Sequence, residues 1–258
     1  MNSPDPALPP APIDARIAIV TGARGGIGRE VVARLRASGY RVAAVGRDAD
    51  TLAAVQADAH IAADTTTPEG AAAAVAACTD QLGRAPSLLA HCVGSTLIAP
   101  LHRSTAAQIR EVLRVNLDSA VFMLQAWIEG IRSSGQPGAA VLTSSVVARI
   151  GVANHEAIAA AKGGIEALAR SAAATHAAAG LRINVVAPGL TETPLTANML
   201  RADAMREGAG KQYPLGGVQT AGQVADTVAW LLSDGAARIT GQVIAVDGGF
   251  TTVRPLVK

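Results

Sequence analysis

"RIAIVTGARGGIGREVVARLRASG", residues 16–39, is the stretch that decides the fold. Residues 16–22 form an apolar run closed by a glycine, which predicts a buried strand. Residues 26–39 predict a helix that ends at Gly39, because glycine readily adopts the backbone conformation that follows a helix. The stretch therefore predicts a strand that passes through a glycine-rich turn directly into a helix.

The same alternation of strand and helix continues along the chain. Strands that are apolar throughout are typical of a parallel sheet with helices on both faces. The sequence thus predicts an α/β fold, a doubly wound parallel sheet in a single Rossmann-fold domain. The further predicted strands are 40–46, 60–64, 87–94, 138–145, 181–189 and 241–249, and the predicted helices are 105–134, 155–179 and 222–233.

The chain divides into a short tail and one domain. Residues 1–13 are Pro-rich without an apolar core, which favours a flexible tail over a signal peptide. Residues 14–258 are expected to form the Rossmann-fold domain, because no linker interrupts the strand–helix pattern. Within it, residues 190–220 are polar and irregular, and we expect them to form a lid over the substrate.

Composition excludes several classes of function. Half of the 258 residues are hydrophobic and the formal net charge is only +2, with basic residues dispersed, so a nucleic-acid partner is not expected. The five histidines lack metal-ligand spacing, and Cys78 and Cys92 form no CxxC pair. No apolar run is long enough to span a bilayer. We expect a cytoplasmic protein with a small-molecule substrate and no bound metal or membrane, and with Trp230 in its core.

The glycine-rich turn, "TGARGGIG" at residues 21–28, predicts a nucleotide site. Gly22, Gly26 and Gly28 follow a G-x3-G-x-G spacing at the first strand–helix junction. Glycines there allow a tight turn and let backbone N–H groups at the helix N-terminus approach a pyrophosphate.

The end of the second predicted strand indicates which dinucleotide binds. An acidic residue at this place would bind the ribose 2′-hydroxyl of NAD(H), but here Arg47 follows Gly46. A guanidinium can bind a 2′-phosphate through two hydrogen bonds, and Arg24 in the glycine turn adds a second positive charge. The sequence therefore favours NADP(H) over NAD(H).

Beyond these patterns, the sequence resembles the short-chain dehydrogenase/reductase family over about residues 14–250. The matching pieces are "TGARGGIG", Asp64 at the end of the third strand, "VNL" with Asn116, "TSSVV" with Ser145, Lys162, "NVVAPGLTET" (184–193) and "ITGQVIAVDGG" (239–249). The resemblance implies an oxidoreductase that binds a nicotinamide cofactor and assembles as a dimer or tetramer of identical subunits.

The resemblance also implies a role for each matching residue. Asp64 would bind the adenine amino group, and Lys162 the hydroxyls of the nicotinamide ribose. Ser145 would hydrogen-bond the substrate oxygen, and Asn116 would hold a water in a proton relay. The full set of implied cofactor-binding residues is Gly22, Arg24, Gly25, Gly26, Ile27, Gly28, Arg47, Asp64, Thr65, Cys92, Gly94, Lys162, Pro188, Leu190 and Thr193.

Two positions depart from the family pattern. The family's N-N-A-G at the end of the fourth strand is "HCVG" here, residues 91–94. The family also places a catalytic tyrosine four residues before the lysine, and that position is Ile158. Ser145 and Lys162 keep the family's usual spacing, which indicates substitution in place. Because isoleucine has no proton to give, the family's ordinary carbonyl reduction should be badly impaired.

One route to activity without the tyrosine uses His155, which lies on the predicted face of Lys162, close to two helical turns before it. Histidine can act as an acid near neutral pH. The divergent enoyl-thioester reductases carry their tyrosine at this earlier position, so the layout resembles theirs. Ser145, His155 and Lys162 would then stabilise an enolate oxygen. Asn154 is expected to cap this helix.

A second route and a role without catalysis remain open, although the retention of Ser145, Asn116 and Lys162 argues against the latter. In the second route, Ser145, Lys162 and a water chain through Asn116 supply the proton to an activated carbonyl such as a quinone or a β-dicarbonyl compound, or Tyr213 folds over the site. In the role without catalysis, the protein binds NADPH without turnover and acts as a sensor or assembly partner.

Overall fold

The computed structural model describes residues 16–256, so the predicted tail at 1–13 lies outside the described residues. Its centre is a seven-stranded sheet in which every neighbouring pair is parallel, in the order β3-β2-β1-β4-β5-β6-β9. The predicted doubly wound sheet is thereby confirmed, with strand ends that differ from the prediction by a few residues. The strands are β1 (Ile17–Thr21), β2 (Arg41–Gly46), β3 (Ala59–Ala62), β4 (Leu88–His91), β5 (Gly138–Thr143), β6 (Leu181–Pro188) and β9 (Val243–Val246).

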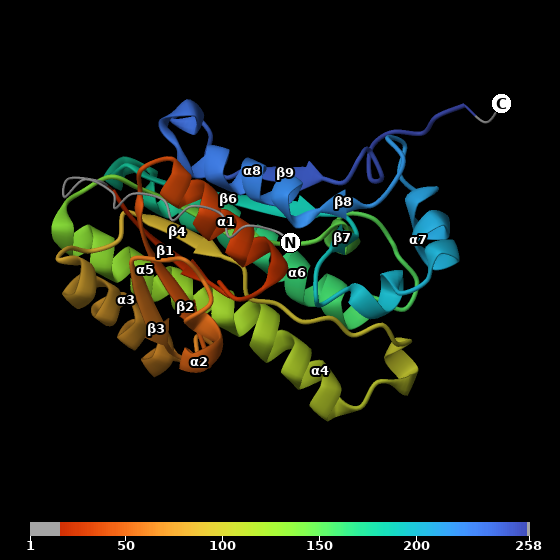
Figure 1. The fold of residues 1–258 in the computed structure, drawn as a ribbon, viewed down its shortest axis with the longest axis horizontal. Coiled ribbons are helices and arrows are strands. Elements are labelled where there is room, and N and C mark those ends of the chain that lie inside the picture. Colours follow the sequence, from red (N-terminus) through yellow and green to blue (C-terminus); the bar gives the residue numbers. More distant parts are fainter. Residues whose placement is uncertain (1–15, 257–258) are drawn as a thin grey trace, which may run out of the picture.

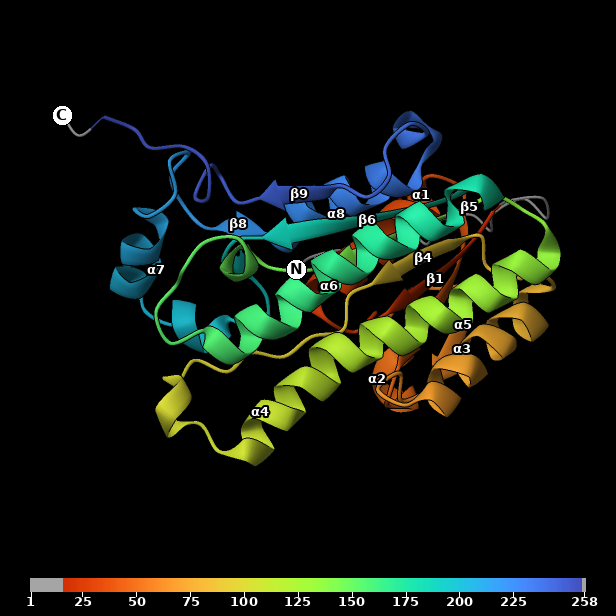
Figure 2. The ribbon, with the colours of Figure 1, turned by 180° about the vertical axis from the view of Figure 1, so that it is seen from behind.

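Helices cover both faces of the sheet (Figures 1 and 2). Helices α1 (Gly26–Ala37) and α8 (Ala221–Leu232) pack on one face, and α3 (Pro68–Leu82), α5 (Ser119–Ser134) and α6 (Glu156–His176) pack on the other. Side chains of a strand alternate between the two faces of a sheet. Both faces of β1 are covered by helices, so its side chains are apolar from Ile17 to Val20. Ile17 and Ile19 join the core beneath α3, α5 and α6, whereas Ala18 and Val20 join the core beneath α1 and α8.

Helix α8 shows where a prediction about the core was wrong. Its buried side chains are Val224, Ala225, Val228, Leu231 and Leu232, which lie on one helical face. Trp230 lies off that face and is 44% exposed, so it does not belong to the core. By contrast, the indole of Trp127 on α5 is fully buried and donates a hydrogen bond to the Pro86 carbonyl over 2.9 Å.

The predicted helix at 105–134 is continuous but contains a widened turn. Helix α4 (Ala106–Leu113) runs through a π-helical turn, Arg114–Asp118, into α5. Such π turns are rare and often occur at functional sites. This one contains Asn116, one of the predicted site residues.

The segment 190–220 is more regular than the sequence predicts. It holds helix α7 (Asp203–Gly210), and its two ends form a small parallel ladder between β7 (Thr191–Glu192) and β8 (Gln219–Thr220). The ladder ties both ends of the predicted lid to one place beside α8 (Figure 1). The remaining short elements are α2 (Ala49–Leu52) and the 3-10 turns Leu101–Arg103, Val146–Ala148, Ala177–Ala179, Ala197–Leu200 and Asp234–Ala236.

The order of the strands places the functional site. Strand β1 has β2 on one side and β4 on the other, because the chain runs outward from β1 to β3 and then returns to form β4 on the opposite side of β1. In open α/β sheets, ligands bind at such a switch point, at the carboxyl ends of the strands. The glycine turn follows β1 at this edge. Within residues 16–256, no helix has the length and apolar character that crossing a membrane requires.

Candidate active site

The glycine turn after β1 is closed so tightly that side chains cannot replace its glycines. Gly22 has a φ of +65°, and a Cβ there would lie 2.7 Å from the carbonyl oxygen of Cys92. A Cβ on Gly28 would collide with the backbone of Gly22. Gly25 precedes α1 without any side-chain capping bond, so the N–H groups of the first helical turn remain available. This cradle fits a pyrophosphate, the anion that dinucleotide cofactors present to such a helix end.

A small charged group lies where the adenosine end of a dinucleotide would reach. Asp64 follows β3 and accepts hydrogen bonds from Thr66, at 3.0 Å from its backbone nitrogen and 2.7 Å from its hydroxyl. These bonds, with the nearby Arg114 and Arg47, lower the pKa of Asp64. Arg114 also pairs with Glu111 at 2.8 Å. The sequence reasoning missed Arg114, although it stands two residues before Asn116.

Arg47 differs from Arg114 in its hydrogen bonds and ion pairs. Arg47 is exposed, and within residues 16–256 its guanidinium makes no hydrogen bond or ion pair, although its charge reaches Asp64 and Glu111. A guanidinium without a partner can turn toward an added phosphate at no loss of existing bonds. Arg24, in the glycine turn, is likewise exposed.

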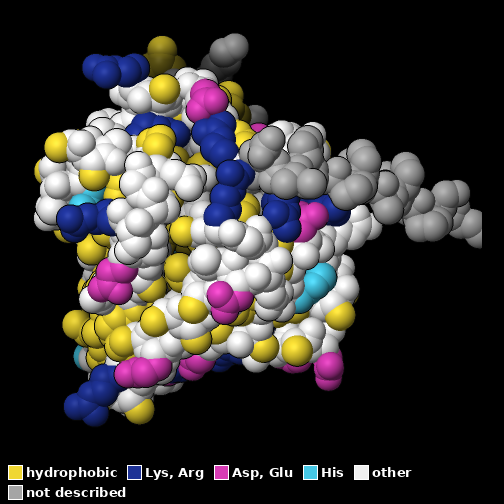
Figure 3. Space-filling view, turned by 90° about the vertical axis from the view of Figure 1, so that its left-hand side faces the viewer, with side chains coloured by type: hydrophobic (Ala, Val, Ile, Leu, Met, Phe, Trp, Pro, Cys, Tyr) yellow, Lys and Arg dark blue, Asp and Glu magenta, His cyan; other side chains and the backbone are white. Residues whose placement is uncertain are grey.

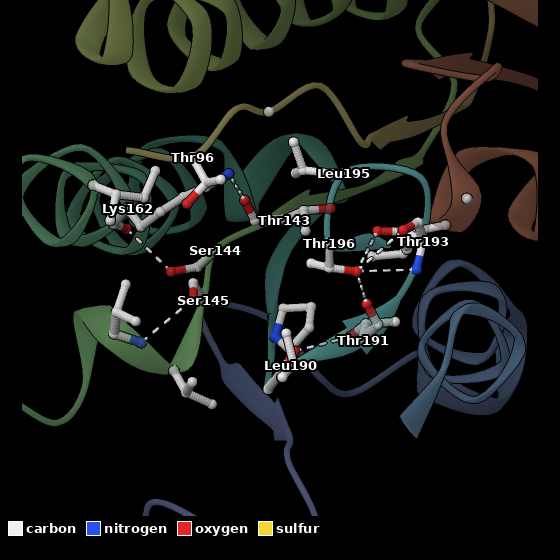
Figure 4. A pocket seen from close by; sticks show the side chains of 18 of the residues that line it. Thr96, Thr143, Ser144, Ser145, Lys162, Leu190, Thr191, Thr193, Leu195 and Thr196 are labelled. Carbon is white, nitrogen blue, oxygen red and sulfur yellow. Dashed lines mark hydrogen bonds between the residues drawn. The ribbon is translucent and has the colours of Figure 1, made fainter. Parts of the chain in front are cut away.

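A cavity of about 420 Å³ opens at the carboxyl ends of the strands and gathers most of the predicted site. Figure 4 shows Ser144, Ser145 and Lys162 on one side of it, and Thr191, Thr193 and Thr196 on the other. The predicted residues outside its lining are Gly22, Arg24, Arg47, Asp64, Thr65 and Asn116. The predicted residues that line it are Gly25, Gly26, Ile27, Gly28, Cys92, Gly94, Ser145, His155, Lys162, Pro188, Leu190 and Thr193.

Lys162 is a buried cation with hydrogen bonds to spare. Its side chain is almost fully buried, and its Nζ donates to the Thr143 carbonyl over 2.8 Å. Burial lowers its pKa to about 8. An ammonium has three N–H groups, so two remain for a ligand.

Asn116 is held beside the same lysine by the π turn. Its Nδ2 donates to the Val112 carbonyl and to Ser95, and its Oδ1 accepts from the Ser95 backbone. A Cβ on Gly94 would lie 3.2 Å from Asn116 Oδ1 and 3.4 Å from Lys162 Nζ. Both polar groups therefore approach the same backbone point, where a side chain larger than glycine's hydrogen would crowd them.

Ile158, four residues before Lys162, makes only hydrocarbon contacts. It is 4% exposed and packs with Val112, Ala157 and Ala161. It also lines the cavity, so the isoleucine forms part of an apolar wall beside Ser145 and Lys162. Nothing in this wall can donate a proton, which confines acid chemistry to neighbouring side chains.

His155 stands at the start of α6, with one ring nitrogen already engaged. Its Nδ1 lies 2.7 Å from the Ala153 carbonyl oxygen. A carbonyl only accepts, so Nδ1 carries the proton, and Nε2 is the nitrogen left for a ligand. His155, rather than Asn154, occupies the capping position, so the capping prediction was wrong. Asn154 instead has a φ of +65°, and its carbonyl accepts a hydrogen bond from Ala99 at 2.9 Å.

Tyr213 also lines the cavity, from the segment after α7. Its hydroxyl oxygen accepts a 2.7 Å hydrogen bond from the Leu190 backbone, and its ring stacks in a tilted geometry on Phe250. Burial raises the pKa of this phenol. The tyrosine thus fastens the lid segment to the turn after β6.

His91, the first residue of the "HCVG" departure, forms a buried bridge behind the site. Its Nδ1 lies 2.8 Å from the Thr21 hydroxyl and its Nε2 lies 3.1 Å from Ser119 Oγ. Ser119 donates its own proton to the Val115 carbonyl, so it accepts from His91 Nε2–H, and Thr21 donates to Nδ1. Burial, with the charge of Lys162, lowers the pKa of His91 to about 3, so the ring stays neutral.

The neighbouring Cys92 has no nucleophilic character. Desolvation raises the pKa of its thiol to about 11, so it remains protonated near neutral pH. Among residues 16–256, no group of three or more His, Cys, Asp or Glu side chains is arranged to hold a metal ion.

Comparison with known proteins identifies the class to which this arrangement belongs. A family model described as "Enoyl-(Acyl carrier protein) reductase" matches residues 22–251. The chain is 36% identical over 245 residues to cis-4-hydroxycyclohexanecarboxylate dehydrogenase of Sinomonas cyclohexanicum, which covers 92% of this chain and 97% of that protein.

Solved structures agree with the sequence matches. A short-chain type dehydrogenase/reductase from Mycobacterium ulcerans has a TM-score of 0.86 at 31% identity, covering 92% of this chain and 90% of its own. A variant of actinorhodin polyketide ketoreductase with NADPH has a TM-score of 0.86 at 25% identity, covering 94% and 100%. This chain belongs to the short-chain dehydrogenase/reductase family and is an oxidoreductase of the type that binds a nicotinamide cofactor.

Proposed function

We propose that this chain is an NADP(H)-dependent oxidoreductase that reduces an activated carbonyl or a conjugated enone or enoyl compound, with His155 replacing the tyrosine. One observation carries the proposal. His155 lines the same cavity as Ser145 and Lys162, and its bond to the Ala153 carbonyl leaves Nε2 as its working nitrogen.

The fixed Nδ1–H defines how His155 handles a proton. For a carbonyl substrate, the imidazolium Nε2–H donates to the oxygen as hydride reaches the carbonyl carbon, and the ring becomes neutral while Nδ1–H stays on the Ala153 carbonyl. For a conjugated substrate, hydride reaches the β-carbon, the oxygen takes the Nε2 proton to give an enol, and water moves this proton to the α-carbon to give the saturated product. In the reverse direction, neutral Nε2 accepts the proton of a substrate hydroxyl. Reduction therefore consumes one proton at Nε2, and oxidation returns it to the same atom.

Ser145 and Lys162 support this step without replacing it. The Ser145 hydroxyl accepts only a long, 3.4 Å bond from the Val147 backbone, so its proton is available to the substrate oxygen. The two unused N–H groups of Lys162 suit the ribose hydroxyls of the cofactor, with the Asn116 site beside them for a relay water. Bound NADPH supplies the hydride.

The preference for NADP(H) rests on Arg47. Among the described residues it has no bonded partner, and it lies near Asp64 just after the end of β2, where an acid would bind NAD(H). The actinorhodin polyketide ketoreductase variant of the same fold was solved with NADPH. A homo-oligomeric assembly and a cytoplasmic location belong to the same proposal.

A substrate panel tests the reaction class. Purified protein with NADPH is expected to consume the cofactor with at least one of three groups, which are quinones and β-dicarbonyls, cyclic enones, and β-ketoacyl or enoyl thioesters. The Sinomonas relative is named as a dehydrogenase and the matching family model as an enoyl reductase. The panel therefore includes both carbonyl compounds and enoyl compounds. Tight NADPH binding without turnover on the whole panel would instead support the sensor or assembly role.

A variant of His155 tests the proton donor. In His155→Ala, kcat is expected to fall by about 10²–10⁴-fold, the typical worth of a general acid, while the NADPH dissociation constant stays unchanged. The matched control is His176→Ala, at the far end of the same helix. Full turnover in His155→Ala would show that water or another group donates the proton.

A further inference from the structure

A second cavity, of about 570 Å³, opens at the opposite edge of the sheet, where the strands begin. Ser87 precedes β4, Arg182 lies at the start of β6, and Arg238 lies in the turn before β9. Figure 3 shows the side of the molecule where β6 and β9 begin, with dark-blue Lys and Arg side chains gathered in its upper half. No residue predicted to bind cofactor or substrate lines this cavity.

Arg182 brings a partly buried positive charge to the cavity. Its Nη1 donates to the carbonyls of Leu231 and Ile239, at 2.8 and 3.3 Å, and its Nη2 donates to Ser233 at 3.1 Å. A guanidinium has five N–H groups, so Nε–H and one Nη2–H are left over. Within residues 16–256 its hydrogen-bond partners are carbonyls and no carboxylate pairs with it. Burial lowers the pKa of Arg182, while the charge of Asp234 acts in the opposite direction and that of Arg16 adds to the lowering.

The other charges around the cavity do not cancel this one. Asp234, its single acidic lining residue, is already held by both Nη atoms of Arg16, each at 2.9 Å. Arg238 is exposed and makes no hydrogen bond or ion pair within the described part of the chain. The lining thus carries three arginines against one aspartate, a surplus of two positive charges.

Ser87 adds an independent sign that something polar is missing. It is 4% exposed, and its hydroxyl is the one buried side-chain polar atom in residues 16–256 without a hydrogen-bond partner. A buried polar group that stays unpaired destabilises the folded chain, so nearly all such groups in proteins find a partner. Ser87 belongs to the lining of the cavity, and its hydroxyl proton has no acceptor among the described residues.

We propose that this cavity binds a small divalent oxyanion of the size of phosphate, held by Arg182 and Arg238 with a hydrogen bond from Ser87. Guanidinium groups bind tetrahedral oxyanions through paired N–H donors, and a dianion matches the surplus charge. The site lies across the sheet from the cofactor edge. It therefore binds its anion whether or not the cofactor is present, and it stabilises the folded chain by mass action.

The test uses the full chain with saturating NADPH, so that the glycine turn cannot take up the probe. Inorganic phosphate is titrated in the millimolar range at ionic strength held constant with sodium chloride, and the melting temperature is recorded. The wild type is expected to show a saturable rise. A wild type whose melting temperature does not respond, or rises without saturating, overturns the proposal.

Two variants and one control locate the anion. Arg238→Gln is expected to weaken phosphate binding by roughly tenfold, since a charge-assisted contact is lost. Ser87→Ala is expected to raise the melting temperature without phosphate, because it removes an unpaired hydroxyl, and to reduce the phosphate response. The control, Arg110→Gln, alters an exposed arginine on α4 and should match the wild type. A phosphate response unchanged in both cavity variants would refute the site.

Discussion

The two walls of the carboxyl-edge cavity are built on different principles. On the wall proposed to hold the cofactor, Lys162 is tied to the Thr143 carbonyl, and Asn116, which lies behind the lining, is tied to the Val112 carbonyl. On the substrate wall, Ile158 packs in hydrocarbon, and Ser145 accepts only a long bond. The difference teaches that hydrogen bonds fix one wall and apolar packing fixes the other, so a change at Ile158 should leave the bonds of Lys162 and Asn116 in place.

The largest expected effect comes from placing a proton donor in the apolar wall, at position 158. Ile158→Tyr is expected to raise kcat for ordinary ketones by about 10²–10⁴-fold, because a phenol would stand beside Ser145 and Lys162. The larger ring should crowd Val112, Ala157 and Ala161 and lower the free energy of unfolding by about 1–3 kcal/mol. Steady-state kinetics with NADPH and urea unfolding measure the two effects.

The matched control is Ile158→Phe, which adds the same ring without the hydroxyl. It should lose a similar amount of stability and gain no activity. Equal gains in both variants would show that the shape of the wall, rather than the missing acid, limits turnover.

The next largest effect is expected at Arg47, which is proposed to bind the adenosine end of the cofactor. Arg47→Ala is expected to weaken NADPH binding by about 10- to 100-fold, the range for losing charge-assisted bonds, while NADH binding stays the same. Fluorescence titration with both cofactors gives the ratio, and Arg132→Ala on α5 serves as an exposed arginine control. Equal losses for the two cofactors would place Arg47 on a shared part of them and remove the argument for NADP(H).

The smallest effect comes from the proton on Lys162. Burial lowers its pKa from 10.5 to about 8, so between these values the unfolded chain binds the extra proton. Stability without cofactor should therefore rise as pH increases through this window. NADPH affinity should fall over the same window, since the ammonium loses a donor.

The opposite pH dependences of stability and NADPH affinity can be separated from the titration of surface groups. Urea midpoints and NADPH dissociation constants are measured from neutral pH to pH above the window. Lys162→Met should flatten both contributions. Lys211→Met removes an exposed lysine paired with Glu207 and should leave both slopes in place. Parallel slopes in the wild type would contradict the assignment of a depressed pKa to Lys162.

Local signals account for the parts of the fold that were predictable. Strand β1, the glycine turn and α1 were found because apolar runs and glycines act within a few residues. The ladder between β7 and β8 was missed, since two-residue strands that pair across the lid leave no periodic trace. Trp230 was placed in the core by its hydrophobicity, whereas the angular position around α8 decides exposure.

The candidate site divides in the same way. Its motif-borne residues, such as Ser145 and Lys162, could be named from spacing and do line one cavity. The tautomer of His155, the bridge through His91 and the free state of Arg47 depend on partners distant in sequence or on loop geometry. Such contacts have no local signature, so only the folded arrangement could reveal them.

The hydrogen bond from Ala99 to the Asn154 carbonyl has a mechanical consequence. It fastens the loop after β4 to the residue that immediately precedes His155. Ile98, on that loop, lines the cavity, so a bulky substrate that pushes against Ile98 would carry the histidine along with it. This single backbone bond thus couples the loop that carries Ile98 to the start of α6, where His155 lies.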